Sequence, residues 1–340
     1  MRLGLYDAIL HDRTLPEAIE AIEVVAGVGL TGIELNTGGF LPPVHVPNID
    51  DILVSDAARD DFLAQFEGTG VSIAGLNCNG NPLHPNPVIG PKHAEDVRRS
   101  IRLAERLGQH RVVTMSGLPG GEPGAMRTNW IVNAWNSAAL EVLDYQWEIV
   151  AGFWRDIDRL ARDHDVKVAL ELHPQNVVFN CASVHKLIDL TGATNIGVEL
   201  DASHLFWQQM DPVAVVRHLG SLVFHAAAKD VRINRATVAL NGVLDNGFRR
   251  LSSEEPRTNL GGDEWANEWP RPSSWDFVAL GKGHDVGYWT EFLRALHEVD
   301  PEMHVNIEHE DVELGRVEGV EAAASVLMAA DAALEASLAR

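Results

Sequence analysis

An eightfold alternation of strand-like and helix-like segments constrains the fold of this 340-residue chain more than any other feature. Short apolar runs rich in Val, Ile, Leu and Ala predict strands, and each is followed by a segment with helical spacing of apolar residues. Such alternation is typical of parallel strands joined by crossover helices, and continuously apolar strands indicate a sheet buried on both faces. We expect strands at residues 3–10, 31–36, 71–77, 111–116, 166–172, 196–200, 222–227 and 304–307, and helices at 15–28, 50–67, 92–107, 137–163, 183–190, 212–219, 288–297 and 316–338.

Eight such units fit either an open doubly wound sheet or a closed barrel. No Gly-x-Gly-x-x-Gly turn follows the first predicted strand, so the main signature of the open dinucleotide-binding sheet is absent. Polar residues stand at the carboxyl ends of many different strands, which is where barrels place their active sites. We therefore predict a single α/β domain over residues 1–340, folded as a (β/α)₈ TIM barrel.

The seventh unit contains a long insertion at residues 231–283. A stretch of that length without regular structure is unusual in a compact domain unless it has a function. Its three tryptophans, Trp265, Trp269 and Trp275, argue against disorder, because disordered segments are poor in aromatic residues. We expect a lid over the barrel mouth or a surface for another chain, with a mobile surface insertion as the alternative.

Four of the predicted strands end in a residue that can bind a metal: Glu171, Asp201, His225 and Glu308. Each one alone is better explained as a helix cap or a member of a surface ion pair. Together, at the functional face of a barrel, they predict one divalent-metal site with a position left open for substrate. Two Glu, one Asp and one His form an oxygen-rich set, which favours Mn²⁺, Mg²⁺ or Co²⁺ over a structural Zn²⁺.

Charge and composition exclude several classes of function. The formal net charge is −22, from 27 basic and 49 acidic residues, and no basic block stands out, which argues against nucleic-acid binding. No stretch reaches the roughly 18 uncharged apolar residues of a membrane span, and the N-terminus lacks the apolar core of a signal peptide. With only two cysteines, Cys78 and Cys181, we expect reduced thiols and a cytoplasmic location.

Several motifs of the chain resemble those of a known superfamily over almost its whole length. They are Glu171-Leu-His-Pro, Leu200-Asp-Ala-Ser-His204, Phe224-His-Ala-Ala-Ala-Lys-Asp230, Gly281-Lys-Gly-His-Asp285 with Trp289, and Ile307-Glu-His-Glu-Asp311. The chain resembles the sugar phosphate isomerase/epimerase superfamily, which has the xylose-isomerase-like barrel. The resemblance implies that Glu171, Asp201, His225 and Glu308 bind one divalent cation, for which we expect Mn²⁺. It also implies that Glu171 and Glu308 exchange the substrate proton, and that His204 contacts a substrate oxygen.

The chemistry that this resemblance implies is proton abstraction next to the carbonyl of a keto-sugar, with the enediolate charge stabilised by the metal. Return of the proton gives isomerisation or epimerisation, whereas loss of a β-substituent gives elimination. Some relatives are catalytic subunits of C-glycoside deglycosidases, which cleave 3-oxo-glucosides by such an elimination and work with a smaller partner subunit. His173 lies two residues after Glu171 on the same strand face, so it is expected either to act as a second base or to orient a metal ligand.

Four further residues are weaker candidates for contacts to a small carbohydrate substrate: Lys229, Asn77, His84 and His284. A metal-dependent phosphodiesterase of the endonuclease IV kind and a non-catalytic sugar-binding or scaffold subunit are the rival functions. The sequence leaves open which sugar or glycoside is the substrate, and whether the chain forms a homo-oligomer or binds a smaller partner.

Overall fold

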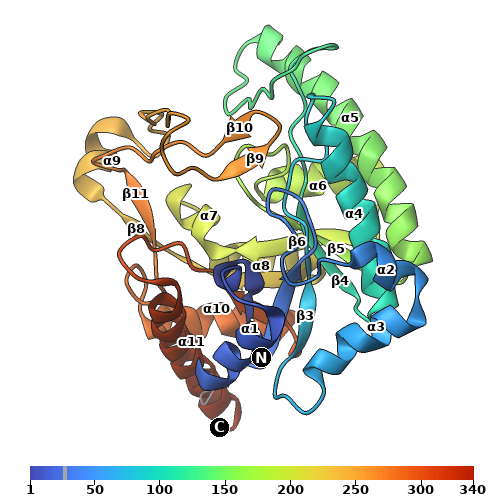
Figure 1. Cartoon of the computed structure of the whole chain (residues 1–340). Coiled ribbons are helices and arrows are strands. Elements are labelled where there is room, and N and C mark those ends of the chain that lie inside the picture. The colour runs from blue at the N-terminus through green and yellow to red at the C-terminus, as the bar shows by residue number, and fades with distance from the viewer. Residues whose placement is uncertain (26–28) are drawn as a thin grey trace.

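The barrel is closed by eight parallel strands, as the sequence predicted (Figure 1). The computed structural model describes residues 1–25 and 29–340. Around the barrel the strands follow the order β1-β12-β7-β6-β5-β4-β3-β2. Their bounds are β1 (Arg2–Tyr6), β2 (Gly32–Asn36), β3 (Ser72–Asn77), β4 (Arg111–Met115), β5 (Lys167–Glu171), β6 (Ile196–Asp201), β7 (Val223–Ala228) and β12 (His304–Ile307). The predicted (β/α)₈ fold is confirmed.

Helices surround the barrel and connect successive strands (Figure 1). They are α1 (Leu15–Val25), α2 (Ile49–Val54), α3 (Asp56–Leu63), α4 (Ile89–Arg106), α5 (Ser137–Asp163), α6 (Cys181–Thr191), α7 (Ala202–Trp207), α8 (Pro212–Leu219), α10 (Val286–Val299) and α11 (Arg316–Leu338). Residues 26–28, the last three of the first predicted helix, lie outside the described residues. Among residues 1–25 and 29–340, no helix is long and apolar enough to cross a bilayer.

Most predicted elements differ from the structure by three residues or fewer at each end, and two differ because the backbone changes within them. The first strand stops at Tyr6 and continues as a 3₁₀ turn (Asp7–Leu10), so Asp7 faces the buried backbone amide of Asn36 and accepts its hydrogen bond at 2.9 Å. The helix expected at residues 50–67 is broken at Ser55, whose backbone is extended. The Ser55 hydroxyl accepts a hydrogen bond from the backbone N–H of Ala58, and this cap begins the new helix α3.

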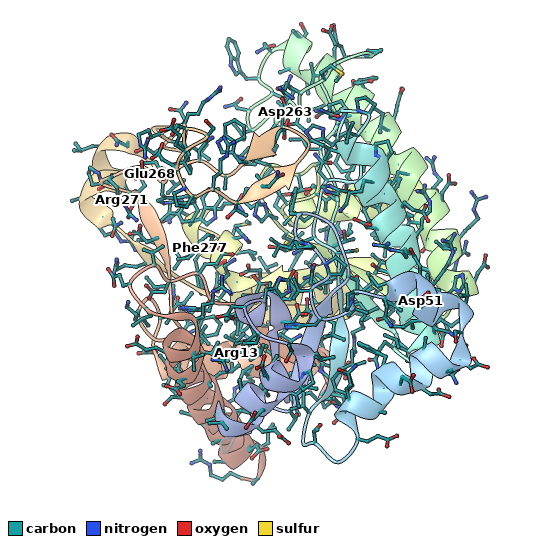
Figure 2. All side chains as sticks on the ribbon, viewed as in Figure 1. Arg13, Asp51, Asp263, Glu268, Arg271 and Phe277 are labelled. Atoms are coloured by element: carbon teal, nitrogen blue, oxygen red, sulfur yellow. The ribbon has the colours of Figure 1, made fainter. Side chains whose placement is uncertain are left out.

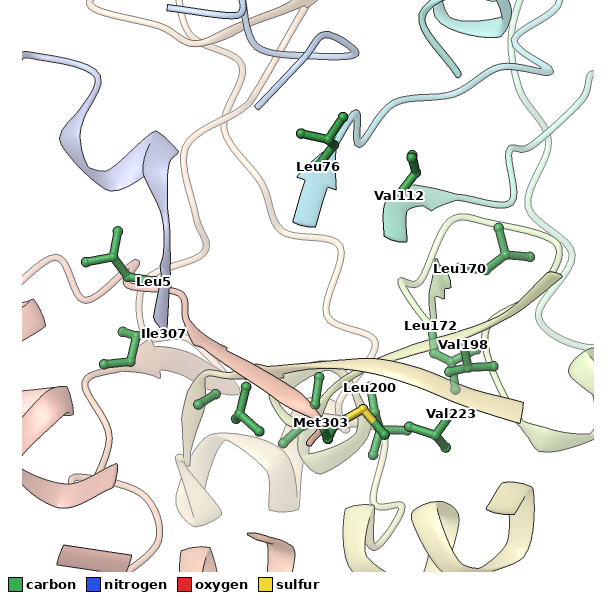
Figure 3. Close-up of a cluster of buried hydrophobic side chains, with 14 of the residues drawn as sticks. Leu5, Leu76, Val112, Leu170, Leu172, Val198, Leu200, Val223, Met303 and Ile307 are labelled. Atoms are coloured by element: carbon green, nitrogen blue, oxygen red, sulfur yellow. The ribbon is translucent and has the colours of Figure 1, made fainter. Parts of the chain in front are cut away.

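The strands alternate between an apolar side and a polar side. Residues that face the helices form a continuous hydrophobic core, as Figure 3 shows for Leu5, Leu76, Leu170, Leu200 and Ile307. Successive strand residues point to opposite faces, so the residues between these apolar ones point into the barrel. Near the carboxyl end of the barrel those inward residues are polar, and this positions the site described below.

The insertion after β7 carries its own regular structure: β8 (Asp230–Ile233), α9 (Arg235–Asn241), β9 (Asn259–Gly261), β10 (Glu264–Trp265) and β11 (Trp275–Val278). β8 and β11 pair antiparallel outside the barrel, and β9 pairs with β10. Figure 1 shows the insertion in orange at the same end of the barrel as α7, which follows the carboxyl end of β6.

Candidate functional site

The carboxyl ends of four neighbouring strands bring a group of charged side chains together at the barrel mouth. Glu171 ends β5, Asp201 ends β6, Lys229 follows β7 and Glu308 follows β12, and these strands are adjacent in the barrel. Asp201 is also the cap of α7, because its Oδ1 accepts a hydrogen bond from the backbone N–H of Ser203 at 2.8 Å. We call these four residues, with His204 on α7, the mouth cluster.

Lys229 lies at the centre of the mouth cluster. Its Nζ is 2.7 Å from Glu310 Oε1, 3.2 Å from Glu308 Oε2 and 3.8 Å from Asp201 Oδ2. Burial alone would lower the pKa of this ammonium, but the surrounding carboxylates outweigh it and hold that pKa well above its usual value. The mouth cluster therefore contains a fixed, buried positive charge with hydrogen bonds to donate.

Two imidazoles border the mouth cluster on the side of β5 and β6. His204 Nε2 lies 3.1 Å from Glu171 Oε1 and 3.4 Å from Asp201 Oδ2. The ring of His173 is 4.2 Å from that of His204, measured between centroids. Burial lowers the pKa of each imidazole to about 4. Both rings are thus neutral near pH 7, and each has a nitrogen lone pair for a proton or a metal ion.

The mouth carboxylates are perturbed in the opposite direction. Burial, helped by the negative charge of Asp201, raises the pKa of Glu171 to about 7. The side-chain amide of Asn79 donates a hydrogen bond to Glu171 Oε2 at 2.5 Å, which fixes the orientation of the carboxylate. Burial also raises the pKa of Glu308 well above its usual range. A carboxyl group with the pKa of Glu171 can take up and return a proton near neutral pH.

The residues of the mouth cluster fit a divalent cation. Asp201 Oδ2 and both ring nitrogens of His204 are buried and have no hydrogen-bond partner among the described residues. One ligand atom each from Glu171, His173 and His204 lie within 4.8 Å of one another. The carboxylates of Glu171, Asp201, Glu308 and Glu310 outnumber the single ammonium of Lys229, so a cation would compensate charge that the protein leaves unbalanced.

His225, predicted to join these ligands, lies deeper in the barrel. In the register of β6 and β7, His225 is the partner of Glu199, whereas the partner of Asp201 is Ala227. His225 Nε2 is 2.8 Å from Glu34 Oε2, and ligand atoms of Glu34, Glu199 and His225 lie within 4.8 Å of one another. In the described part of the chain, no group of ligand atoms within that distance contains all four residues predicted as ligands.

The remaining predicted substrate residues are distributed between the barrel interior and the insertion. Asn77 donates a hydrogen bond to Glu34 Oε1 at 2.7 Å, beside His225. His84 Nε2 is 3.2 Å from Glu264 of the insertion. His284 Nδ1 is 2.7 Å from Asp230 Oδ1 at the base of the insertion. The structure thus brings Glu171, His173, Asp201, His204, Lys229 and Glu308 together, and places Asn77, His84, His225 and His284 around them.

The insertion covers the mouth cluster. Phe277 of β11 lies with its ring 4.4 Å from Lys229 Nζ and 5.5 Å from the ring of His204. Trp275 stacks on Trp207 of α7 at 4.7 Å between ring centroids. Figure 2 shows Phe277 on the side of the insertion that faces the barrel, with Glu268 and Arg271 on the outer side. His204 and Lys229 are each only 3% exposed beneath it.

The sequence reasoning missed several residues that shape this site: Asn79, Glu199 and Phe277. Glu310, which pairs with Lys229, also borders the site. Glu199 was detectable, because it lies two residues before Asp201 in the strand and must share its face. Asn79 and Phe277 carried no such signal, since their contacts join segments far apart in sequence.

Comparison with known proteins identifies similar chains. The family model described as xylose isomerase-like TIM barrel matches residues 22–330. The uncharacterized protein YfiH of Bacillus subtilis (strain 168) is 32% identical over 312 residues, which are 91% of this chain and 93% of that protein.

Among solved structures, the 3-keto-D-glucoside 4-epimerase YcjR of E. coli has a TM-score of 0.60 at 12% identity, covering 99% of both chains. The IOLI protein with a bound zinc atom has a TM-score of 0.59 at 17% identity and also covers 99% of both chains. At these identities the two structures show a common fold.

Proposed function

Because the chain belongs to the xylose isomerase-like TIM barrel family, we propose that it is an enzyme that moves a proton next to the carbonyl of a small sugar. The observation that carries this proposal is a pair of carboxyl groups with raised pKa values at the carboxyl mouth of the barrel: Glu171, which is buried, and Glu308, which is half-buried and paired with the Lys229 ammonium. Proton abstraction at carbon needs a base near neutrality and a positive group for the oxyanion, and the mouth cluster supplies both.

A divalent cation is the cofactor that the mouth cluster suits. Asp201, Glu171, Glu308 and His204 would hold it, and this oxygen-rich set favours Mn²⁺, with Mg²⁺ or Co²⁺ as substitutes. The solved structure of similar fold with a zinc atom supports a metal in this family. Bound there, the cation supplies Lewis-acid polarisation of a substrate carbonyl.

The side chains of the mouth cluster perform the proton transfer. One carboxylate, Glu171 or Glu308, removes the proton from the carbon next to the carbonyl. The electron pair of that C–H bond forms a C=C bond to the carbonyl carbon, and the π pair of the C=O bond moves onto the oxygen. The Lys229 ammonium donates a hydrogen bond to the oxygen on which negative charge develops. The protonated carboxyl, or its counterpart across the mouth, returns the proton. Addition to the opposite face gives the epimer, and addition to the neighbouring carbon gives the isomer.

His173 separates these reactions from an elimination. Isomerisation and epimerisation need only the two carboxyl groups. Cleavage of a 3-oxo-glycoside also needs a general acid that donates a proton to the leaving group. In this proposal His173, whose ring lies beside that of His204, is that acid. A free keto-sugar and a 3-oxo-glycoside are therefore the two substrate classes to test. The 3-keto-D-glucoside 4-epimerase of similar fold supports including the second class.

Residues 231–283 act as a lid in this proposal. Phe277 covers Lys229 and His204, which leaves them almost without solvent exposure. A substrate reaches these groups only after the insertion moves away, and its return excludes water from the reaction. The exposed ion pairs of Arg127 with Asp263 and Glu264 hold the lid closed weakly, at 3.2 Å each.

The proposal is tested by loading purified protein with Mn²⁺ and following keto-sugars and 3-oxo-glycosides by NMR. Wild-type protein should convert at least one of them. Glu171→Gln and Glu308→Gln should each lower kcat/KM by about 100-fold or more, because each removes a proton carrier while keeping the side-chain shape. Glu302→Gln is the matched control and should leave turnover unchanged. Glu302 precedes β12, at the end of the barrel opposite the mouth cluster, and its exposed carboxylate pairs with Arg2. Equal turnover in all four proteins would refute the proposal.

A further inference from the structure

A second group of side chains that can bind a metal lies inside the barrel, deeper than the mouth cluster. Glu34 comes from β2, Glu199 from β6, His225 from β7 and Asn306 from β12. We call these four residues the inner cluster. Glu34 and Asn306 are 1% exposed, and Glu199 and His225 are fully buried. Ligand atoms of the two glutamates and the histidine lie within 4.8 Å of one another.

The hydrogen bonds of the inner cluster satisfy one of its carboxylates and leave the other without any partner. Glu34 accepts from Asn77 at 2.7 Å and from Asn306 at 2.6 Å, and its Oε2 is 2.8 Å from His225 Nε2. By contrast, both oxygens of Glu199 lack a partner among the described residues. The same holds for His225 Nδ1 and Asn306 Oδ1. Buried polar atoms are rarely left unpaired, so this concentration of them around one carboxylate indicates a missing ligand.

The backbone leaves room for these side chains. A Cβ atom on Gly4 of β1 would lie 2.5 Å from Asn306 Oδ1. On Gly75 of β3 it would lie 3.7 Å from the ring of His225, in ordinary van der Waals contact. A larger side chain at either position would therefore push into the inner cluster, and glycine keeps that part of the barrel interior free.

Charge decides what the missing ligand is. Glu34 and Glu199 place two carboxyl groups close together with no water contact, and the ammonium of Lys229 is paired instead with Glu308 and Glu310. Two buried carboxylates without a cation are strongly unfavourable. A divalent cation with two carboxylates and a neutral imidazole is electrically balanced, and these ligand types suit Mn²⁺ or Zn²⁺.

We propose that the inner cluster is a second, fully buried site for a divalent cation, with Glu34, Glu199 and His225 as its protein ligands. Asn306 Oδ1 is a buried acceptor without a partner, on a side chain whose amide nitrogen lies 2.9 Å from His225 Nε2, and it is the candidate for a fourth ligand. This site is separate from the cation of the proposed function, since its ligands come from other residues. Its enclosure by the barrel gives it a structural role or a role in shaping the field at the mouth, and no direct contact with substrate.

A proton is the competing solution for the inner cluster. Glu199 in its neutral form would remove one of the two buried negative charges without a metal. Burial together with the charge of Glu34 raises the pKa of Glu199 well above its usual range, which fits that state in the absence of a cation. The two solutions differ in metal content, which can be measured directly.

The experiment counts Mn²⁺ ions on the full-length protein after it has been stripped with a chelator and reloaded. Stoichiometry is measured by elemental analysis and by titration with EPR detection of free Mn²⁺. Wild-type protein should bind two ions per chain. Glu199→Gln should bind one, and Asp201→Asn, which alters only the mouth cluster, should also bind one. Glu313→Gln is the matched control, with an exposed carboxylate paired to Lys282 and Arg232, and should keep two.

The outcomes separate the inner site from the proposed function. One ion in wild type that is lost in Asp201→Asn but kept in Glu199→Gln would overturn the inner site and leave the mouth cation in place. One ion lost in Glu199→Gln but kept in Asp201→Asn would support the inner site and remove the cation from the proposed function. No bound ion in wild type would overturn both.

Folding of Glu199→Gln is checked by circular dichroism. If this variant fails to fold, the wild-type count and the count of Asp201→Asn decide instead. The visible spectrum of Co²⁺ bound to Asp201→Asn should then show the bands of an imidazole-ligated ion. A spectrum equal to that of free Co²⁺ would overturn the site.

Discussion

Asp230 joins the two ends of the insertion, so replacing it tests how the lid is anchored. The residue is fully buried. Its Oδ2 accepts hydrogen bonds from the backbone N–H groups of Gly281, Gly283 and His284 at 3.1, 3.0 and 2.9 Å. Its Oδ1 accepts from the backbone N–H of Val231 at 2.8 Å and lies 2.7 Å from His284 Nδ1.

The Asp230→Asn variant keeps the size of the side chain and converts one of these acceptors into a donor. If the amide replaces Oδ2, three backbone N–H groups lose their acceptor, and if it replaces Oδ1, one backbone N–H and one imidazole nitrogen do. A buried donor without a partner costs about 1–3 kcal/mol. Even with relaxation in the better of the two orientations, we expect the free energy of unfolding to fall by about 3 kcal/mol.

Urea denaturation followed by circular dichroism measures this loss. Limited trypsinolysis should in addition show faster cleavage after Arg249, Arg250 or Arg257, since these lie within the loosened insertion. Asp245→Asn is the matched control, because Asp245 is only half-buried and its hydrogen bonds are to Asn241 and Gly247 within the insertion, and it should change stability by less than about 1 kcal/mol. A loss below about 1 kcal/mol for Asp230→Asn, with unchanged proteolysis, would refute the anchoring role.

Three further predictions concern the barrel and its site. Gly4→Ala should lower the free energy of unfolding, measured by urea denaturation, by about 3 kcal/mol or more, because the new Cβ would lie 2.6 Å from the backbone oxygen of Gly32. Gly152→Ala in helix α5 is the comparison: its new Cβ would meet nothing within 4 Å, so the free energy of unfolding should rise by about 0.5–1 kcal/mol. Burial lowers the pKa of His93 to about 4, below its value in the unfolded chain. The contribution of neutral His93 to the free energy of unfolding is therefore fully present above about pH 6.5 and is lost as the pH falls toward 4. His93→Gln should flatten this pH dependence of the free energy of unfolding in urea titrations, and an unchanged pH dependence would contradict the prediction. Lys229→Met should destabilise the metal-free protein by about 3 kcal/mol, because it leaves the carboxylates of Asp201 and Glu308 without their ammonium partner. Mn²⁺ should raise the melting temperature of this variant more than that of wild type, and equal shifts would contradict the idea that Lys229 and the cation compensate the same carboxylates.

The barrel could be predicted because its signals are local. Each strand reads as an apolar run such as residues 166–172, and each helix repeats its apolar residues with helical spacing. Boundaries were less accurate where one residue changes the backbone. Ser55 is an example, since nothing in the helical pattern of residues 50–67 requires a break, and the cap at Ser55 decides it.

The mouth cluster could be predicted for the same reason, because parallel strands all present their carboxyl ends at one face of the barrel. Glu171, Asp201 and Glu308 end or follow their strands; Asp201 and Glu308 lie beside Lys229, and Glu171 lies beside His204. The prediction that they bind a metal with His225 depended on register, which strand ends do not reveal. β7 is irregular opposite Val198 and Glu199, so that Val198 pairs with Val223 and Glu199 pairs with His225. This places His225 beside Glu199 and leaves Ala227 opposite Asp201.

The contacts of the insertion were beyond prediction from sequence. The tryptophans of residues 231–283 indicated an ordered segment, and Trp275 does pack on Trp207. The residue that covers the mouth, however, is Phe277, and its contact with Lys229 depends on how β11 pairs with β8 outside the barrel. Pairing of this kind joins residues more than forty positions apart and follows from tertiary packing rather than from local propensity.

Solvent deuterium exchange is the most direct test of proton abstraction by Glu171 and Glu308, because it reports that step even where no net product forms. Mn²⁺-loaded protein is incubated in D₂O with each keto-sugar and 3-oxo-glycoside, and deuterium is located by NMR at single-carbon resolution. We predict that deuterium enters the carbon next to the carbonyl of at least one compound, and that Glu171→Gln and Glu308→Gln abolish this exchange while Glu302→Gln does not. Absence of exchange with every compound, or undiminished exchange in both variants, would contradict it.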